Sequence, residues 1–222
     1  AWDSDDNRTV VAGGGVSVRP FRRGRLTVVG SQRRAALGEL VGHSTAGRMA
    51  LRLGVGRRVT LVGDVGATRM AAARGPLSTD RTVATAGVSA TVRVRARLSL
   101  GAAARRSAFD ETAALLLAGI DVATIGAEGE WEPFGRVSLA GGVERASLRG
   151  GSGPNVRTSG SGAVRWRARR QLSLSVAGRT FSYEVLRRDG YFSPSRFQLA
   201  EAGARWTLGR DLGWTGAFEA AF

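Results

Sequence analysis

The residues that could carry out acid–base chemistry gather around a single histidine. His43 is the only histidine of the 222-residue chain, with Ser44 beside it and Glu39 four residues before it. An acid, a histidine and a serine can together activate a nucleophile. We place all three in one solvent-exposed loop, where a histidine is far more common as a surface residue. We therefore predict that the protein is not an enzyme and has no catalytic residues.

Metal and cofactor chemistry has little support in the residue types. The chain has no Cys, and one histidine is too few for a histidine-based metal site. Two glycine-rich stretches, Gly13–Gly15 and Gly150–Gly153, are not followed by a helix that could cradle a phosphate. We predict no cofactor.

The charge first suggests nucleic acid, because arginines neutralise phosphates. There are 33 basic residues, all of them Arg, against 18 acidic ones, and the formal net charge is +15. These arginines are spread along the whole chain and recur at alternate positions, as at Arg93, Arg95 and Arg97. Alternation places guanidinium groups on one side of a strand and apolar groups on the other. We therefore predict no nucleic-acid partner.

Alternation of apolar and polar residues is the main signal, and it recurs in twelve segments of about 10–13 residues. One face of every segment carries no charge, although 23% of the chain is charged. The uncharged faces run through residues Val10–Val18, Leu26–Gly30, Gly47–Val55, Val59–Ala67, Ala84–Val94, Leu98–Ala104, Ile125–Trp131, Val137–Val143, Gly160–Trp166, Leu172–Gly178, Ala202–Leu208 and Leu212–Phe222.

Lipid explains such faces, because an Arg facing the middle of a bilayer costs about 2–4 kcal/mol in a membrane barrel. A soluble β-sandwich also alternates, but its strands are shorter and its inward residues bulkier. No apolar run is long enough for a membrane-spanning helix, since the longest extends over Thr112–Ile120. We predict an all-β fold, an antiparallel transmembrane β-barrel in the bacterial outer membrane.

The connections predict the topology. Short turns such as Gly56–Arg57 and Pro133–Phe134 alternate with longer loops, as expected for periplasmic turns and extracellular loops. The longer loops are expected at 34–44, 71–80, 106–121, 149–155 and 184–195. Residues 110–119 fit either a helical turn or two or the extension of a strand. With both chain ends then outside, we predict one domain over 1–222, truncated at both ends and belonging to a barrel of 14–16 strands.

The opposite, polar faces supply candidates for a pore lining. Arginines there would make a lumen electropositive and favour anions or hydroxyl-rich polymers. Such residues can also pair across strands and only stiffen the wall. Phe181 and Tyr183 are the best aromatic platforms on this face. The candidate lining consists of Arg48, Arg52, Arg93, Arg165, Arg167, Arg179, Arg205, Glu128, Glu130 and Glu201.

One loop motif carries a resemblance to a known family. Gly190-Tyr191-Phe192-Ser193-Pro194, followed by Arg196-Phe197, stands before a predicted strand. It resembles the C-terminal barrel of outer-membrane exopolysaccharide exporters, such as the exporter of the cellulose synthase operon, whose barrel follows an array of tetratricopeptide repeats. The acidic opening Asp3–Arg8 and the stretch Ile120–Trp131 are similar to that barrel type as well. Pro194 also has a purely structural reading, since it fixes φ where the loop returns to a strand.

The resemblance implies a pore that exports a secreted, cellulose-like polysaccharide. Its implied partners are the polymer, a periplasmic tetratricopeptide-repeat scaffold and an inner-membrane synthase, in addition to the outer-membrane lipid and lipopolysaccharide that a barrel contacts. The alternative is a structural barrel that anchors an envelope complex and conducts nothing. Single-channel conductance separates the two.

Overall fold

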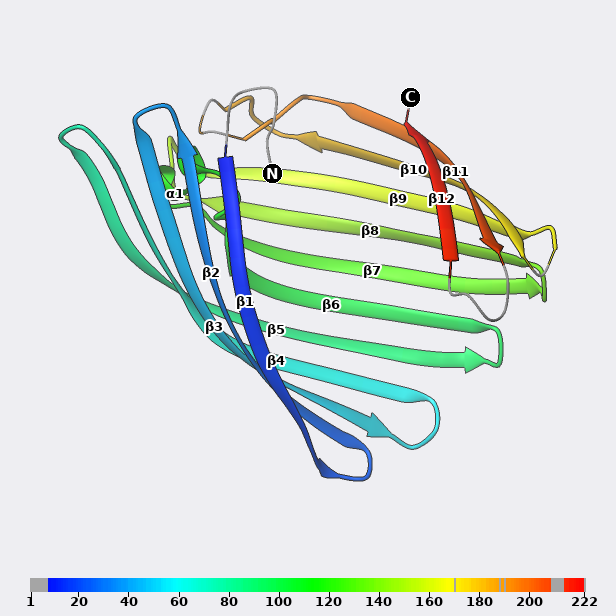
Figure 1. The fold of residues 1–222 in the computed structure, drawn as a ribbon. Helices are drawn as coiled ribbons and strands as arrows, with labels where there is room; N and C mark the ends of the chain where they lie inside the picture. The colour runs from blue at the N-terminus through cyan, green and yellow to red at the C-terminus, as the bar shows by residue number, and fades with distance from the viewer. Residues whose placement is uncertain (1–7, 170, 188, 190, 209–213, 222) are drawn as a thin grey trace.

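The computed structural model describes residues 8–169, 171–187, 189, 191–208 and 214–221. They form one antiparallel sheet in which each strand pairs with its neighbours in sequence, in the order β1 to β12 (Figure 1). The strands are β1 (Arg8–Phe21), β2 (Gly24–Leu37), β3 (Leu40–Val55), β4 (Val59–Arg74), β5 (Leu77–Arg95), β6 (Leu98–Ala108), β7 (Asp121–Phe134), β8 (Val137–Arg149), β9 (Asn155–Arg167), β10 (Leu172–Tyr183), β11 (Phe197–Leu208) and β12 (Trp214–Ala221).

The register of the sheet aligns the uncharged faces of neighbouring strands. Val28 of β2 lies opposite Met49 of β3, which in turn lies opposite Val65 of β4. The same holds on the other half of the sheet, where Leu139 of β8 lies opposite Val164 of β9. A slip of one residue would turn every side chain to the other face, so this match fixes the register. Each of the twelve predicted segments falls within a strand over its described residues.

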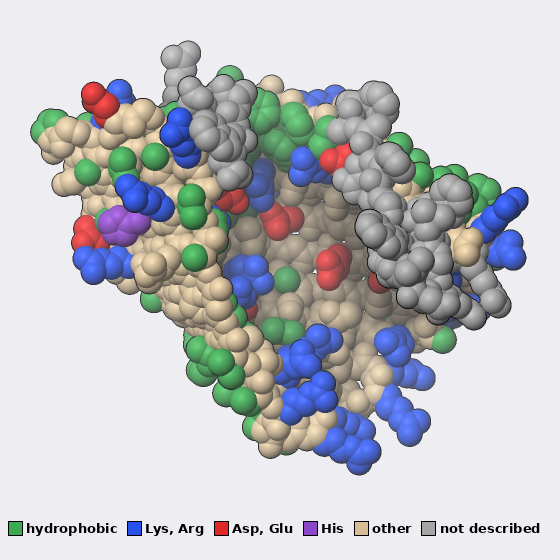
Figure 2. Space-filling view, in the orientation of Figure 1, with side chains coloured by type: hydrophobic (Ala, Val, Ile, Leu, Met, Phe, Trp, Pro, Cys, Tyr) green, Lys and Arg blue, Asp and Glu red, His purple; other side chains and the backbone are tan. Residues whose placement is uncertain are grey.

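The two faces of the sheet differ in polarity. The outward face is apolar, as contact with lipid requires, and the inward face is polar, as contact with water requires. Large apolar side chains on the outward face are exposed, with Ile125 and Val143 each at 65%. The inward face carries the polar and charged residues, and Figure 2 shows red and blue side chains within the hollow of the curved sheet. Trp131 and Trp166 lie half-exposed near the short-turn ends of β7 and β9, as aromatic residues do at a membrane interface.

Two predicted loops are wrong. Residues 34–44 and 71–80 are strand for most of their length, and tight turns at Gly38-Glu39 and Gly75-Pro76 join β2 to β3 and β4 to β5. Both glycines have a φ of +57°, which only glycine adopts at little cost. The strands continue beyond the apolar band, where outward positions become polar, so the hydrophobic alternation that marks a lipid-facing strand disappears.

The connection between β6 and β7 turns inward and contains the short helix α1 (Ala113–Ala118). Of the two alternatives that the sequence leaves open for this stretch, it therefore forms the helical turn and not the strand extension. Thr112 caps its first turn by accepting a hydrogen bond from the Leu115 amide, and Gly119 ends it with a φ of 62°. Leu116 packs on the inner face of β2–β5, whereas Leu115 packs with inner residues of β8 and β10. The segment therefore bridges two parts of the wall at the long-loop end.

Within the described residues, β1 pairs only with β2 and β12 only with β11, so the sheet has two edges. Residues 1–7, which include most of the acidic opening, and Gly190 of the loop motif lie outside the described residues. No helix in the described ranges has the length and apolar character needed to cross a bilayer.

Candidate pore lining

All ten residues predicted to line a pore occupy strand positions out of phase with the outward apolar residues, and so belong to the concave face. The strands bring Arg48 and Arg52 to one hollow on β2–β4. Glu128, Glu130, Arg179 and Glu201 line another hollow across β7–β11. Arg93, Arg165, Arg167 and Arg205 alternate with Val92, Val164, Trp166 and Ala204, which all lie on the outward face.

Arg48 is the one member of this set with an ion pair among the described residues. Its Nε and Nη2 atoms donate to Asp64 Oδ2 and Oδ1 at 2.8 and 2.5 Å. The Asp64 side chain is only 6% exposed. A Cβ atom at Gly87, directly opposite Asp64, would lie 2.6 Å from Asp64 Oδ1, so the carboxylate occupies space that glycine leaves open.

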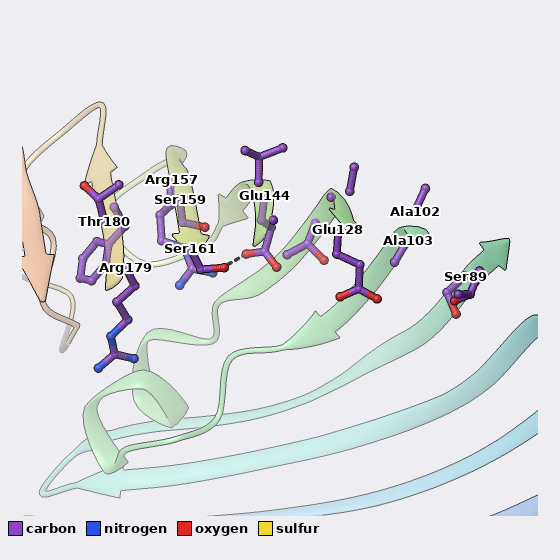
Figure 3. Close-up of a pocket in the computed structure, with 18 residues that line it drawn as sticks. Ser89, Ala102, Ala103, Glu128, Glu144, Arg157, Ser159, Ser161, Arg179 and Thr180 are labelled. Carbon is purple, nitrogen blue, oxygen red and sulfur yellow. Dashed lines mark hydrogen bonds and ion pairs between the residues drawn. The ribbon is translucent and has the colours of Figure 1, made fainter. Parts of the chain in front are cut away.

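The centre of the concave face holds a polar groove. One hollow of about 480 Å³ is lined by Glu128, Glu144, Arg157 and Arg179 together with serines, threonines and Phe181. It shares Glu128 and Arg179 with the adjoining hollow of about 520 Å³. Figure 3 shows these four charged side chains projecting from β7, β8, β9 and β10, with Arg157 donating to Glu144 at 2.7 Å. Serine, threonine and glycine between the charges leave the groove wide.

Aromatic side chains gather where this groove approaches the long-loop end. Phe181, predicted as a platform, stacks on Phe197 with ring centroids 4.7 Å apart. Tyr183, also predicted, packs against Tyr191 at 5.4 Å, and Tyr191 packs against Phe109 at 5.8 Å. Phe192, at 65%, is the exposed member of the group.

The loop motif acts as a clamp on the β10–β11 connection. The Ser193 hydroxyl donates to the Arg187 carbonyl at 2.9 Å and accepts from the Arg187 amide at 2.8 Å, closing a small ring of chain. The Pro194 carbonyl accepts from the Tyr183 amide at 3.0 Å. Through these bonds Ser193 and Pro194 hold the loop beside the aromatic cluster.

Asn155 connects this loop to the wall and was not predicted. Its amide group donates to the Val185 carbonyl at 2.7 Å and to the Tyr191 hydroxyl at 3.0 Å, and its Oδ1 accepts from the Val185 amide at 3.0 Å. The Asn155 side chain thus donates to and accepts from the Val185 backbone, as a paired residue of a neighbouring strand would. An asparagine at the start of a strand gives no sequence signal for this role.

A second unpredicted contact holds the inward segment that contains α1. Asp110 accepts from Arg33 Nη1 at 3.0 Å and from the Ser44 hydroxyl at 2.5 Å. Both donors lie on the inner wall, on β2 and β3. We call this group the Asp110 latch.

The relay of Glu39, His43 and Ser44, which the sequence makes conceivable but does not favour, does not form. His43 and Ser44 are consecutive residues of β3 and therefore face opposite sides of the sheet. His43 is exposed on the outer side, whereas Ser44 is 3% exposed and belongs to the Asp110 latch. Glu39 lies in the turn between β2 and β3. The histidine is a strand residue on the outer side instead of a loop residue.

Between the apolar band and the long-loop end, outward positions are polar, and two of them form an ion pair across neighbouring strands. Arg69 donates to Asp80 at 3.0 and 2.5 Å across β4 and β5. Hydrogen bonds from the Arg69 guanidinium lower the pKa of the Asp80 carboxyl below its ordinary value. Both side chains lie beyond the lipid-facing stretch, where charges are solvated.

No protein-family model and no curated protein matches this sequence. Solved structures do match. The FrpB iron transporter of Neisseria meningitidis has a TM-score of 0.66 and 8% identity over 97% of this chain and 42% of its own. A bacterial polysaccharide outer membrane secretin has a TM-score of 0.64 and 15% identity, over 96% and 70%. The TodX monoaromatic hydrocarbon channel has a TM-score of 0.59 and 10% identity, over 95% and 78%.

These likenesses show the fold. The chain has the antiparallel strand architecture of outer-membrane β-barrels, as predicted, and the compared proteins are transporters and channels. It spans less than half the length of the FrpB chains it matches.

Proposed function

We propose that this chain forms the wall of an outer-membrane pore that exports a polysaccharide. The observation that carries the proposal is the groove on the concave face, in which Glu128, Glu144, Arg157 and Arg179 are interleaved with small hydroxyl residues. A chain of sugars offers many hydroxyl groups, each a donor and an acceptor. Charged residues at intervals along a wide polar wall can exchange hydrogen bonds with such a chain as it slides.

The aromatic residues support a sugar more than a small ion. Phe181 and Phe197 stack at the end of the groove, and Phe181 also lines it. Flat rings accommodate the apolar faces of sugar units, whereas small ions need no such platform. The likeness in fold to a polysaccharide secretin agrees with this substrate class, and the loop motif suggests a cellulose-like polymer.

The proposal extends to the surroundings of the chain. The outward apolar face, with Trp131 and Trp166 near its short-turn edge, fits outer-membrane lipid and lipopolysaccharide. Further strands would complete a barrel of 14–16, and a periplasmic tetratricopeptide-repeat scaffold and an inner-membrane synthase would deliver the polymer.

Disulfide cross-linking tests whether further strands separate β1 from β12. Since the chain has no Cys, cysteines introduced into β1 and β12 would cross-link only if these two edges meet directly.

The test is conductance in planar bilayers. We expect the protein, purified from outer membranes, to give steady open currents that oligosaccharides of the transported type interrupt briefly. Phe181→Ala should shorten these interruptions without changing the open current, because it removes a stacking surface and no charge. Val185→Ala, on the neighbouring loop, is the control. A protein that folds but conducts neither in its natural form nor in variants that release the segment containing α1 would remove the pore from consideration.

One observation favours the second candidate, a non-conducting anchor. The segment that contains α1 packs on both β2–β5 and β8–β10 from the inside and narrows the space between them. If that segment fills the lumen, the barrel would serve only to hold an envelope complex. Absence of current both in the natural protein and in variants that release the segment would support this candidate.

A further inference from the structure

The short-turn end of the sheet contains a hollow in which every charged lining residue is an arginine. It has a volume of about 370 Å³ and lies over the first four strands and their turns. Figure 2 shows blue side chains gathered at the lower end of the hollow sheet. The lining consists of Arg19, Arg22, Arg23, Arg25 and Arg52 together with Gly24, Gly54, Gly56 and Thr60, and includes no carboxylate.

These arginines share the hollow with one another and with no acidic side chain. Arg25 of β2 lies directly opposite Arg52 of β3 in the register, and both belong to the concave face. Like charges directly opposite each other destabilise a sheet. None of the five forms an ion pair with another described residue.

The same arrangement recurs farther along this end of the sheet. The Arg93 amide donates to the Arg58 carbonyl at 2.7 Å, and the Arg167 amide donates to the Arg136 carbonyl at 2.7 Å. Each bond continues the register by one residue, so the turn residues Arg58 and Arg136 lie opposite Arg93 of β5 and Arg167 of β9. Among the described residues, none of the six arginines in these three pairs forms an ion pair.

The long-loop end is different. There Arg33 pairs with Asp110, Arg81 and Arg106 pair with Asp121, and Arg145 pairs with Glu184. Arginines with a structural role thus have acidic partners in this protein. The unpaired ones concentrate at the opposite mouth, which indicates that their partner comes from outside the chain.

We propose that the short-turn mouth binds carboxylate groups carried by the transported polymer, so that the substrate is an acidic polysaccharide and not the neutral, cellulose-like polymer that the loop motif suggests. This inference rests on the proposed function. A guanidinium fork matches the two oxygens of a carboxylate, and a series of forks allows successive acidic units to bind as the polymer arrives. Bound carboxylates would also relieve the repulsion between Arg25 and Arg52. Because these two side chains lie on the concave face, the ligand is in the lumen and not in the lipid.

The first measurement does not require conduction. Fluorescein-labelled polygalacturonate, dextran sulfate and neutral dextran are titrated against the micelle-solubilised protein and followed by fluorescence anisotropy. We expect polygalacturonate to bind, neutral dextran not to bind, and the affinity for polygalacturonate to fall as salt is raised, because screening weakens exposed charges. Tighter binding of dextran sulfate than of polygalacturonate would assign the site to sulfated polymers and overturn the carboxylate assignment.

The variants locate the site. In the double variant Arg25→Gln and Arg52→Gln we expect affinity for polygalacturonate to fall about tenfold or more, since two charge-assisted hydrogen-bonding groups are lost. The matched control is the double variant Arg34→Gln and Arg57→Gln, which also removes two charges but leaves the lining of the hollow unchanged. An equal loss in both proteins would mean that only net charge matters and would overturn the inference.

Conductance then separates this inference from the proposed function. In planar bilayers, polygalacturonate fragments added on the short-turn side should interrupt the current more often than neutral dextran fragments. If the pore conducts but both polymers interrupt the current equally often, the assignment of an acidic substrate is wrong and the proposed pore stands. If polygalacturonate binds at Arg25 and Arg52 but no current flows, either in the natural protein or in Asp110→Ala, the pore is wrong and the anion site stands.

Discussion

Arg48 and Asp64 are joined by two hydrogen bonds across β3 and β4, at 2.8 and 2.5 Å, with the carboxylate 6% exposed. This is the only bidentate arginine pair on the concave face of the described residues. It fixes the direction of Arg48, which would otherwise be free to reach into the lumen. Of the ten lining candidates, Arg48 is therefore the one whose role is best described as stiffening the wall.

We expect Asp64→Asn to lower the free energy of unfolding by about 1.5–3 kcal/mol, the usual contribution of a hydrogen bond to a charged group. The half-exposed guanidinium keeps the loss below that of a fully buried pair. Urea unfolding in detergent micelles, followed by tryptophan fluorescence, measures it. Glu128→Gln, which removes a carboxylate without a partner among the described residues, is the control and should change stability little.

The Asp110 latch should control the width of the lumen. Asp110→Ala removes the acceptor for Arg33 and Ser44, so the segment that contains α1 loses its anchor on the inner wall. We expect a larger single-channel conductance with more fluctuation. The control is Glu111→Ala, which removes one negative charge from the exposed residue next to Asp110 and should leave the conductance unchanged. An identical conductance in both variants would show that the segment does not restrict the lumen.

Gly42 allows α1 to dock, which can be tested independently of charge. A Cβ atom at Gly42 would lie 2.7 Å from Leu116 Cδ1, so Gly42→Val should push the helix away from the wall. We expect the same rise in conductance as for Asp110→Ala. Gly47→Val is a matched control on the same strand, because nothing lies within 4 Å of its added Cβ on the outward face.

Asn155 should determine the order of the β10–β11 connection. In Asn155→Ala the Val185 backbone and the Tyr191 hydroxyl lose their partner. We expect trypsin to cut after Arg187 several-fold faster, since an unanchored loop opens more often. Gln198→Ala, an exposed position on β11, should be cut at the natural rate. Equal rates in the two variants would mean that the aromatic packing of Tyr191 alone holds the loop.

Lipid on the outward face can be tested with one strand. Val143 is outward and Ala140 is inward on β8. We expect Val143→Arg to lower the stability of the protein folded in lipid vesicles by about 2–4 kcal/mol, and Ala140→Arg to be tolerated. Folding is followed by the gel-mobility shift between folded and unfolded forms. The reverse order would place lipid on the other face.

The sequence predicts a strand wherever contact with lipid requires apolar outward residues. Beyond the apolar band this requirement ends, and the sequence does not show that the strands continue. Every lipid-facing segment has a period of two, so its strand and its inward residues, including Glu128 and Arg179, can be read directly. Above the apolar band Arg34, His43 and Arg69 occupy outward positions, and without apolar alternation the strand extensions there resemble loops. The partners of Asp110 lie 66 and 77 residues away in the chain. No local pattern specifies contacts over such distances.

The pairing of each strand with only its sequence neighbours bears on how the protein is made. Each hairpin has its own apolar outward face and its own charged inward face, and its turn sets the register of its two strands. The sheet can therefore grow one hairpin at a time, without a search for distant partners, and local contacts of this kind favour rapid folding. Biogenesis would then be limited by delivery of hairpins to the bilayer and not by the rearrangement of a collapsed chain.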